Sequence, residues 1–316
     1  MKIGLLCGRE YAFPPAFLQR VNELGAEHGI TAEFVKLTGT KMGEPSGYRV
    51  IVDRISHEVE YYRAYLKHAV LTGTYVINNP FWWTADDKFF NYAIAQKVGV
   101  AVPKTVVLPQ KSYPADIDLT AESLHNLGYP IDWDGLLDYV GRPAILKPYS
   151  GGGWKHVYKV SNREELIAAY DGTGPYCMTL QQFIHFDQYV RCFTFGKTEI
   201  TPVRYDPHER RYLVEHSYLT PELGERIVTD ARTLNTALGY EMNTIEFAVE
   251  NGIPYAIDFL NPAPDFERDR ITPHYFDIVV DKMARLAIDR ALSGTPSQSW
   301  PRWAEMTGLS TVTRPV

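Results

Sequence analysis

Cysteine and long apolar segments are scarce in this chain of 316 residues. Its three cysteines, Cys7, Cys177 and Cys192, are odd in number and far apart, which predicts neither a disulfide framework nor a CxxC metal site. No apolar window is long enough for a membrane helix, and the opening MKIGLLCGRE lacks the apolar core and small-residue cleavage site of a signal peptide. We therefore expect a soluble, cytoplasmic protein with no membrane partner.

Basic runs are also absent, and the formal charge is −6 at pH 7, so the composition argues against a nucleic-acid partner. Two nucleotide-binding signatures are missing as well. Gly196, Lys197 and Thr198 look like the end of a P-loop, but Arg191 stands where the first glycine is required, and no GxGxxG follows the first strand. A local cluster of lysine and arginine can nevertheless bind a small anion inside an acidic protein.

The N-terminal part of the sequence alternates strands with helices. Apolar runs predict strands at residues 2–6, 32–37 and 48–56, and helically spaced apolar residues predict a helix over 15–28. This alternation predicts a small parallel α/β unit, which binds ligands at the carboxyl ends of its strands. Arg9 and Glu10 follow the first strand, so we expect them to face a substrate.

A glycine-rich loop lies in AILKPYSGGGWKHVYKV, residues 144–160, where Gly151, Gly152 and Gly153 follow a strand that ends near Lys147. Glycines let backbone N–H groups approach phosphate oxygens, and a lysine held by a strand supplies a fixed positive charge. The loop alone is equally consistent with a lid over a triphosphate and with a glycine-rich turn beside an exposed lysine.

A hairpin turning at Gly196 and Lys197 carries Arg191 and Arg204 on its two strands. If the turn has two loop residues, strand alternation puts both arginines on one face of the sheet, where they would stabilise an anion. A loop longer or shorter by one residue separates them, and the alternative is then a surface pair.

Five segments, in this order, resemble the ATP-grasp superfamily, the group of D-alanine:D-alanine ligase, glutathione synthetase and the ribosomal-protein glutamate ligases. They are DDKFFNYAIAQKVGVAVPKTVVL, ILKPYSGGGWKHVYKV, LQQFI, YVRCFTFG and TIEFAVENGIPYAIDFLNP. The resemblance implies an α/β protein with a parallel N-terminal domain (residues 1–84), a central lobe with a glycine-rich lid (85–180) and a C-terminal lobe with a metal site (181–316).

The resemblance also implies an ATP site. Lys88 and Lys147 match the two lysines that hold ATP phosphates, and Gly151–Gly153 match the phosphate loop. The segment that reads adenine consists of Gln181, Gln182, Phe183 and Ile184. Tyr189 or Gln188, with Asp187 before them, stands where the family has an acidic residue for the ribose.

Glu246, Asp258 and Asn261 match the family's Mg²⁺ ligands, although Asp258 precedes Asn261 by three residues where the family has two. Oxygen ligands on adjacent strands suit a hard cation, and both carboxylates stand among apolar neighbours, where an unpaired charge is costly. Strand alternation brings both carboxylates to one face only if the loop between the strands is odd in length. We therefore predict a three-residue loop of Glu250, Asn251 and Gly252, despite the Asn-Gly signal for a tighter turn.

The chemistry that the resemblance implies is carboxylate activation, in which MgATP phosphorylates a substrate carboxylate and an amine displaces phosphate, assisted by Arg191 and Arg204. The expected substrates are a small-molecule or peptide carboxylate and an amine, and the cofactors are ATP and Mg²⁺. A kinase acting on a hydroxyl and a non-catalytic nucleotide-binding protein are the alternatives. The sequence leaves the oligomeric state open, a homo-oligomer included.

Overall fold

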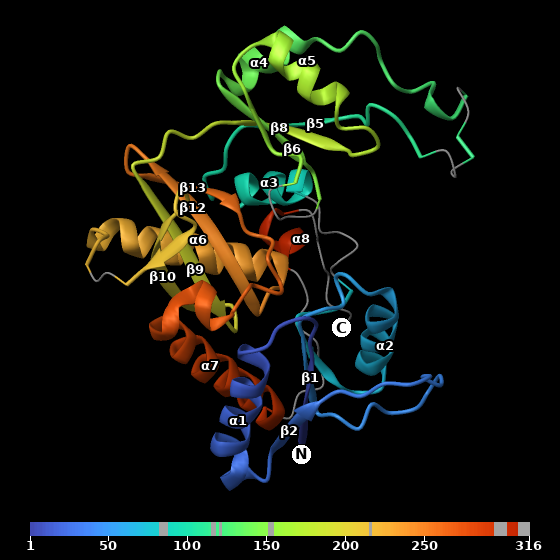
Figure 1. Cartoon of the computed structure of the whole chain (residues 1–316), viewed down its shortest axis with the longest axis vertical. Helices are drawn as coiled ribbons and strands as arrows, with labels where there is room; N and C mark the ends of the chain where they lie inside the picture. Colours follow the sequence, from blue (N-terminus) through green and yellow to red (C-terminus); the bar gives the residue numbers. More distant parts are fainter. Residues whose placement is uncertain are drawn as a thin grey trace. The chain divides into compact units, whose positions relative to one another are not determined.

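The computed structural model describes residues 1–81, 88–114, 118–119, 122–150, 155–214, 217–293 and 302–308. The chain divides into two compact units, one made of Met1–Thr84, Gln188–Phe247 and Asp258–Val316, the other of Ala85–Asp187 and Ala248–Ile257. One parallel and two antiparallel sheets with their helices confirm the predicted α/β class (Figure 1). No helix in the described part of the chain is long and apolar enough to cross a membrane.

A parallel sheet opens the first unit. Its strands, in the order β2-β1-β3-β4, are β1 (Lys2–Leu6), β2 (Thr31–Phe34), β3 (Val50–Asp53) and β4 (Tyr75–Ile77). Helix α1 (Phe13–Gly25) packs on one face and helix α2 (Glu60–Leu71) on the other, because successive strand residues point to opposite faces. The strand order reverses beside β1, so the carboxyl ends of β1 and β3 form the edge where open α/β sheets bind ligands.

A second, antiparallel sheet follows later in the chain, in the order β11-β10-β9-β12-β13. Its strands are β9 (Gln188–Phe195), β10 (Glu199–Asp206), β11 (Arg211–Leu213), β12 (Met242–Glu250) and β13 (Ile253–Asp258). Helices α6 (Pro221–Leu238), α7 (Arg268–Leu292) and α8 (Trp303–Met306) accompany them. Phe193 and Phe195 of β9 share one apolar core with α1 and α7, so residues from both ends of the chain build the first unit.

The second unit contains the remaining sheet, in the order β5-β8-β6-β7. Its elements are α3 (Lys88–Lys97), β5 (Thr105–Leu108), α4 (Trp133–Val140), β6 (Ala144–Pro148), β7 (Tyr158–Val160), α5 (Arg163–Asp171) and β8 (Met178–Gln182). Apolar side chains of α4 and α5 cover one face of this sheet (Figure 1). Strand alternation turns Lys147 of β6 and Gln181 of β8 to the other face.

The β9–β10 hairpin differs from the prediction. Its loop has three residues, Gly196 to Thr198, because Gly196 and Lys197 both adopt left-handed φ values, 63° and 72°, and Glu199 is the first residue to pair, with Phe195. Arg191 therefore pairs with Val203, and Arg204 pairs with Val190. The predicted placement of both arginines on one face is wrong, since this register sends them to opposite faces.

The β12–β13 hairpin also differs from the prediction. Strand β12 ends at Glu250 and β13 begins at Ile253, so the loop consists of Asn251 and Gly252, with φ values of 52° and 75°. Two successive left-handed residues define the tight turn that Asn-Gly signals. The predicted three-residue loop is wrong, and strand alternation now places the side chains of Glu246 and Asp258 on opposite faces.

Candidate functional site

Lys147 lies at the polar face of the second unit's sheet. Its neighbours Ala144 and Leu146 in β6 point into the core under α4 and α5, so strand alternation turns Lys147 the other way. Its ammonium group donates to the Tyr92 hydroxyl of α3 at 2.9 Å and to the Ile257 carbonyl oxygen of β13 at 3.3 Å. These contacts fix the position of the charge.

Lys88 is the first residue of α3 and is only 8% exposed. Its backbone N–H donates to the carbonyl oxygen of Tyr149 at 2.9 Å, two residues beyond Lys147. This hydrogen bond joins the start of the helix to the end of β6. The two lysines predicted to hold phosphates are therefore anchored on adjoining backbone segments, whereas Gly151, Gly152 and Gly153 lie outside the described residues.

Gln181 and Gln182 end strand β8 in the middle of the same sheet. The buried Gln181 amide donates to Thr105 Oγ1 at 2.9 Å. The backbone N–H of Gln182 donates to the Lys104 carbonyl oxygen at 2.8 Å, and its side-chain oxygen accepts from the Lys104 N–H at 3.2 Å. These hydrogen bonds hold β8 against β5 and give the predicted adenine segment a defined backbone.

Phe183 and Ile184 continue that segment beyond β8. Ile184 is buried, with 5% exposure, while the Phe183 ring is partly exposed and has the Lys159 ammonium group 4.0 Å from its centroid. An aromatic ring and an apolar side chain next to each other provide stacking surface for a planar heterocycle. The arrangement is compatible with adenine, although nothing in the sequence singles out Lys159.

A partly buried polar cluster forms on β9 and β12 in the first unit. The Arg191 guanidinium pairs with Glu246 at 2.5 Å, and the Tyr189 hydroxyl donates to the same carboxylate. Burial, reinforced by the Glu246 charge, holds the pKa of the Tyr189 phenol well above its usual range, so Tyr189 remains a donor. Tyr189, predicted as a ribose contact, thus has the metal-ligand candidate Glu246 as its hydrogen-bond partner.

Two further tyrosines surround Arg191. Its Nη1 donates to the Tyr212 hydroxyl at 3.1 Å, and its guanidinium carbon lies 3.8 Å from the Tyr205 ring centroid. Burial alone would lower the pKa of Arg191, but the Glu246 carboxylate and the Tyr212 phenol outweigh burial and raise it. Arg191 is therefore a fixed cation, and its Nε is buried without a hydrogen-bond partner in the described part of the chain.

Arg204 does not belong to this cluster. It is exposed, and the β9–β10 register directs it to the face opposite Arg191. Sequence reasoning missed Tyr205 and Tyr212, which take the positions around Arg191 instead. The alternation of side chains along the strands was the one sequence signal for Tyr205. If the β9–β10 loop has three residues, Tyr205 lies on the same face of the sheet as Arg191.

Asp258 and Asn261 flank the point where β13 ends. The tight β12–β13 turn means that strand alternation no longer places Asp258 on the same face as Glu246. The charge of Asp258 is nevertheless close enough to Tyr189 to contribute to the raised pKa of that phenol. The backbone N–H of Asn261 donates to Asn243 Oδ1 at 2.9 Å. Asn243 also donates to the Phe259 carbonyl oxygen at 2.9 Å, so its side chain holds the segment that follows β13.

The donor atoms of Glu246, Asp258 and Asn261 are all oxygens, which suits Mg²⁺. Among the described residues, no group of three His, Cys, Asp or Glu side chains is arranged to hold a metal by itself. Mg²⁺ is commonly held by one or two carboxylates and completed by water and substrate phosphates. Oxygen donors of this kind are compatible with a magnesium ion that nucleotide phosphates would complete.

At the N-terminal sheet, Glu10 and Arg9 have separate partners. The Glu10 carboxylate binds Arg54 Nε through both oxygens, at 2.9 Å each, and the Arg54 side chain is only 1% exposed. The rings of Phe13 and Phe266 lie 4.7 Å from the Arg54 guanidinium. Arg9 is 85% exposed and pairs with Glu58 at 3.0 Å, so the two residues predicted to face a substrate diverge.

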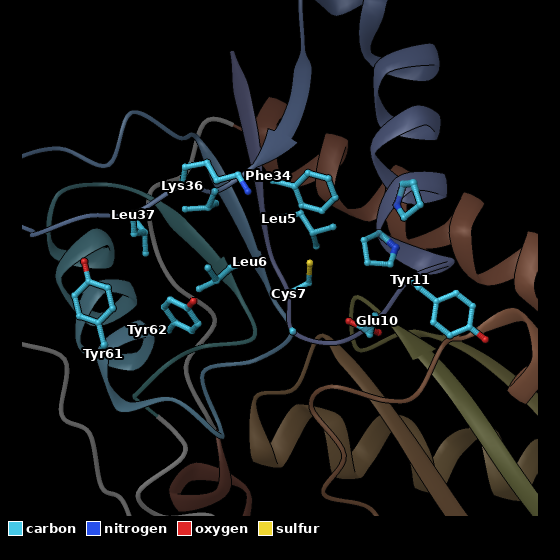
Figure 2. A pocket seen from close by; sticks show the side chains of 14 residues that line it. Leu5, Leu6, Cys7, Glu10, Tyr11, Phe34, Lys36, Leu37, Tyr61 and Tyr62 are labelled. Atoms are coloured by element: carbon cyan, nitrogen blue, oxygen red, sulfur yellow. The ribbon is translucent and has the colours of Figure 1, made fainter.

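A pocket of about 660 Å³ opens at the carboxyl ends of β1 and β2 (Figure 2). Glu10 lines it, but Arg9 is not among its lining residues. Apolar and aromatic residues outnumber charged ones in its lining, although polar atoms make up slightly more of the exposed lining than apolar atoms, and the lining comes from the end of β1, the first turn of α1, the residues after β2 and the start of α2. Its volume lies in the range of small-molecule sites.

Solved structures match this chain over most of its length. A RimK domain ATP-grasp protein from Sphaerobacter thermophilus is 17% identical, with a TM-score of 0.66 over 92% of this chain and 100% of that one. The D-alanine–D-alanine ligase of Bacillus anthracis complexed with ATP is 18% identical, with a TM-score of 0.58 over 93% and 97%. The macrocyclase MdnC of Microcystis aeruginosa, bound to its precursor peptide MdnA, is 13% identical, with a TM-score of 0.61 over 92% and 100%.

No protein-family model and no curated protein sequence matches the chain. The structural matches span both compact units and nearly the whole of each matched chain. The chain therefore has the ATP-grasp fold, as the order of its motifs predicted.

Proposed function

We propose that this protein is an ATP-dependent ligase that joins a carboxylate to an amine and releases ADP and phosphate. The observation that carries the proposal is the full-length match to ATP-grasp ligases, including a D-alanine–D-alanine ligase complexed with ATP. The placement of Lys88 and Lys147 on adjoining backbone segments of the second unit supports it, since two lysines on such segments suit the charge of a triphosphate.

In the proposed reaction, a carboxylate oxygen attacks the γ-phosphorus of ATP, and the bond from that phosphorus to the β-γ bridging oxygen breaks. ADP leaves and an acylphosphate forms. The amine then attacks the acyl carbon, loses a proton and expels inorganic phosphate, which leaves an amide. Such chemistry requires fixed cations around the phosphoryl group and exclusion of water, rather than a protein nucleophile.

The residues of this chain have separate proposed roles. Lys88 and Lys147 bind phosphate oxygens, and residues 181–184 orient the adenine. Arg191, fixed by Glu246 and Tyr212, supplies a permanent positive charge in the first unit. Arg204 remains a weaker candidate for anion binding on the opposite face of the sheet.

Glu246 and Asn261 are the proposed magnesium ligands, and Asp258 is a third candidate that rests on its charge near Tyr189. Bound Mg²⁺ would neutralise charge on the nucleotide phosphates. Arg191 and Tyr189 hold the Glu246 carboxylate in one orientation, so its position does not depend on the ion. In this arrangement the Tyr189 hydroxyl donates to Glu246, a proposed metal ligand, rather than to a ribose.

A product assay tests the proposal. The protein is incubated with MgATP, pooled carboxylic acids and pooled amines, and products are identified by mass spectrometry. A ligase releases equal amounts of ADP and phosphate only when an amine is present, and yields an amide. ADP with a phosphorylated alcohol would instead indicate a kinase, and ATP binding without turnover would indicate a non-catalytic protein. Lys147→Ala serves as the inactive control.

A further inference from the structure

The pocket at the carboxyl ends of β1 and β2 has a lining whose chemistry defines a ligand class. Phe34, Tyr61 and Tyr11 expose 40%, 43% and 66% of their surfaces, respectively. Figure 2 shows Cys7 in the middle of the pocket, Tyr61 and Tyr62 at one end and Tyr11 at the other. Exposed rings around a cavity favour a ligand with an apolar or aromatic body.

Lys36 gives the pocket its charge. Its ammonium group lies 5.7 Å from the Phe34 ring centroid, and Figure 2 shows it directed toward that ring. Lys36 makes no ion pair with any residue that the structure describes. A cation beside exposed aromatic rings in a pocket attracts a carboxylate that carries an apolar body.

No anion in the pocket compensates Lys36. Among the described residues that line the pocket, Glu10 is the only acidic one, and both its oxygens are bound by Arg54. The remaining candidate is the Cys7 thiol. Burial and the nearby Glu10 charge raise the pKa of that thiol, so it is neutral at pH 7. The pocket as a whole therefore favours an anionic ligand and disfavours an amine cation.

We propose that this pocket binds a carboxylate that carries an apolar or aromatic side chain, with Lys36 contacting the carboxylate and Phe34 and Tyr61 contacting the body. One part of this inference rests on the proposed ligase function: the carboxylate that binds here would be one of the two substrates that the ligase joins. The pocket serves recognition, and no bond forms or breaks there. The specificity for the ligand body would then reside in the parallel N-terminal sheet.

Ligand-observed NMR titrations of the full-length protein without ATP test the binding. The probes are N-acetyl-L-phenylalanine, its amide, N-acetylglycine and phenethylamine. N-acetyl-L-phenylalanine should bind about fivefold more tightly than its uncharged amide, the effect expected for one partly exposed charge pair. It should bind at least about tenfold more tightly than N-acetylglycine, because the phenyl group is lost. Phenethylamine should bind most weakly of the aromatic probes.

Variants separate this pocket from non-specific binding. Lys36→Met should bring the affinities for acid and amide together, and Lys36→Glu should make the acid bind more weakly than the amide. Lys41→Met, which changes an exposed lysine outside the pocket lining, should leave the preference for the acid unchanged. Phe34→Ala should weaken acid and amide alike. Circular dichroism and thermal unfolding establish that each variant is folded.

Equal binding of acid and amide, an acid preference that survives Lys36→Met, or no binding of any probe up to its solubility limit would each overturn the inference. The ligase proposal fails separately. If the probes bind as expected but no combination of acid and amine leads to ATP consumption, the proposed carboxylate pocket is supported and the proposed ligase function is contradicted. If the protein turns over ATP and the KM for aromatic acids is the same in the wild-type protein and in Lys36→Met, the proposed ligase function is supported and the proposed carboxylate pocket is contradicted.

Discussion

At the scale of single residues, the sequence predicted lysines and an arginine for a nucleotide site, and that assignment stays a prediction, but the sequence did not reveal all the partners of these side chains. Lys147 and Lys88 occupy anchored positions, because a strand end and a helix start fix them. The partners of Arg191 could not be predicted in the same way. Tyr205 and Tyr212 reach it only because of the register of two neighbouring hairpins, and that register depends on loop lengths that composition does not specify.

Lys147→Ala should weaken ATP binding by about tenfold or more, since truncation removes a charged hydrogen-bond donor to phosphate. The fold should persist, because Lys147 contributes polar contacts with Tyr92 and Ile257 and is not part of the apolar core. Calorimetric titration with ATP measures the change. Lys111→Ala is the matched control, because Lys111 is an exposed lysine of the same unit that pairs with Asp171. Unchanged affinity in folded Lys147→Ala would remove Lys147 from the site.

Glu246→Gln should weaken Mn²⁺ binding in the presence of ATP by about tenfold, whereas Asp258→Asn should have a smaller effect. The reason is strand alternation, which directs the two side chains to opposite faces of the sheet. Electron paramagnetic resonance of free Mn²⁺ gives both affinities without an activity assay. Equal losses in the two variants would return Asp258 to the metal site and show that the strand end bends its side chain toward Glu246.

At the scale of elements, the strands were more predictable than the loops between them. Apolar runs correctly predicted β1 and located β3 within residues 48–56, since a buried strand leaves a local pattern. The β12–β13 loop had a correct local signal, Asn251-Gly252, which a distant requirement for a shared metal wrongly overrode. The β9–β10 loop had no such signal, because Lys197 adopts a left-handed φ that lysine rarely takes.

Gly252→Ala should destabilise the protein by about 1 kcal/mol, the cost of placing a side chain in the left-handed region. The cost would be purely conformational, because an added methyl group at Gly252 would meet nothing within 4 Å. Gly39→Ala is the control, as its surroundings are equally open and its φ is not left-handed. Urea unfolding of both variants measures the difference. A neutral Gly252→Ala would contradict the tight turn.

At the scale of the whole molecule, the order of motifs predicted the fold, although no single motif was specific. Each motif lies at a particular position in the fold, such as a strand end or a hairpin. The order of the motifs along the chain therefore indicates the order of the strands and helices. The pocket above β1 and β2 could not be predicted. Phe34 and Lys36 lie at or just after the end of β2, whereas Tyr61 lies in the first turn of α2 much later in the chain, and only the pairing of β1 with β2 and the position of α2 bring these three residues to one pocket.

Two ligands should protect two different parts of this molecule. The proposed phosphate and adenine residues, Lys88, Lys147 and 181–184, all belong to the second unit, whereas the pocket around Lys36 belongs to the first. Hydrogen exchange measured by mass spectrometry should therefore slow in α3, β6 and β8 with ATP, because binding reduces local opening. N-acetyl-L-phenylalanine should instead slow exchange in β1, in β2 and at the start of α2. Protection by ATP that is confined to the N-terminal sheet would place the nucleotide in the pocket, and would contradict both the proposed ATP site and the proposed carboxylate site.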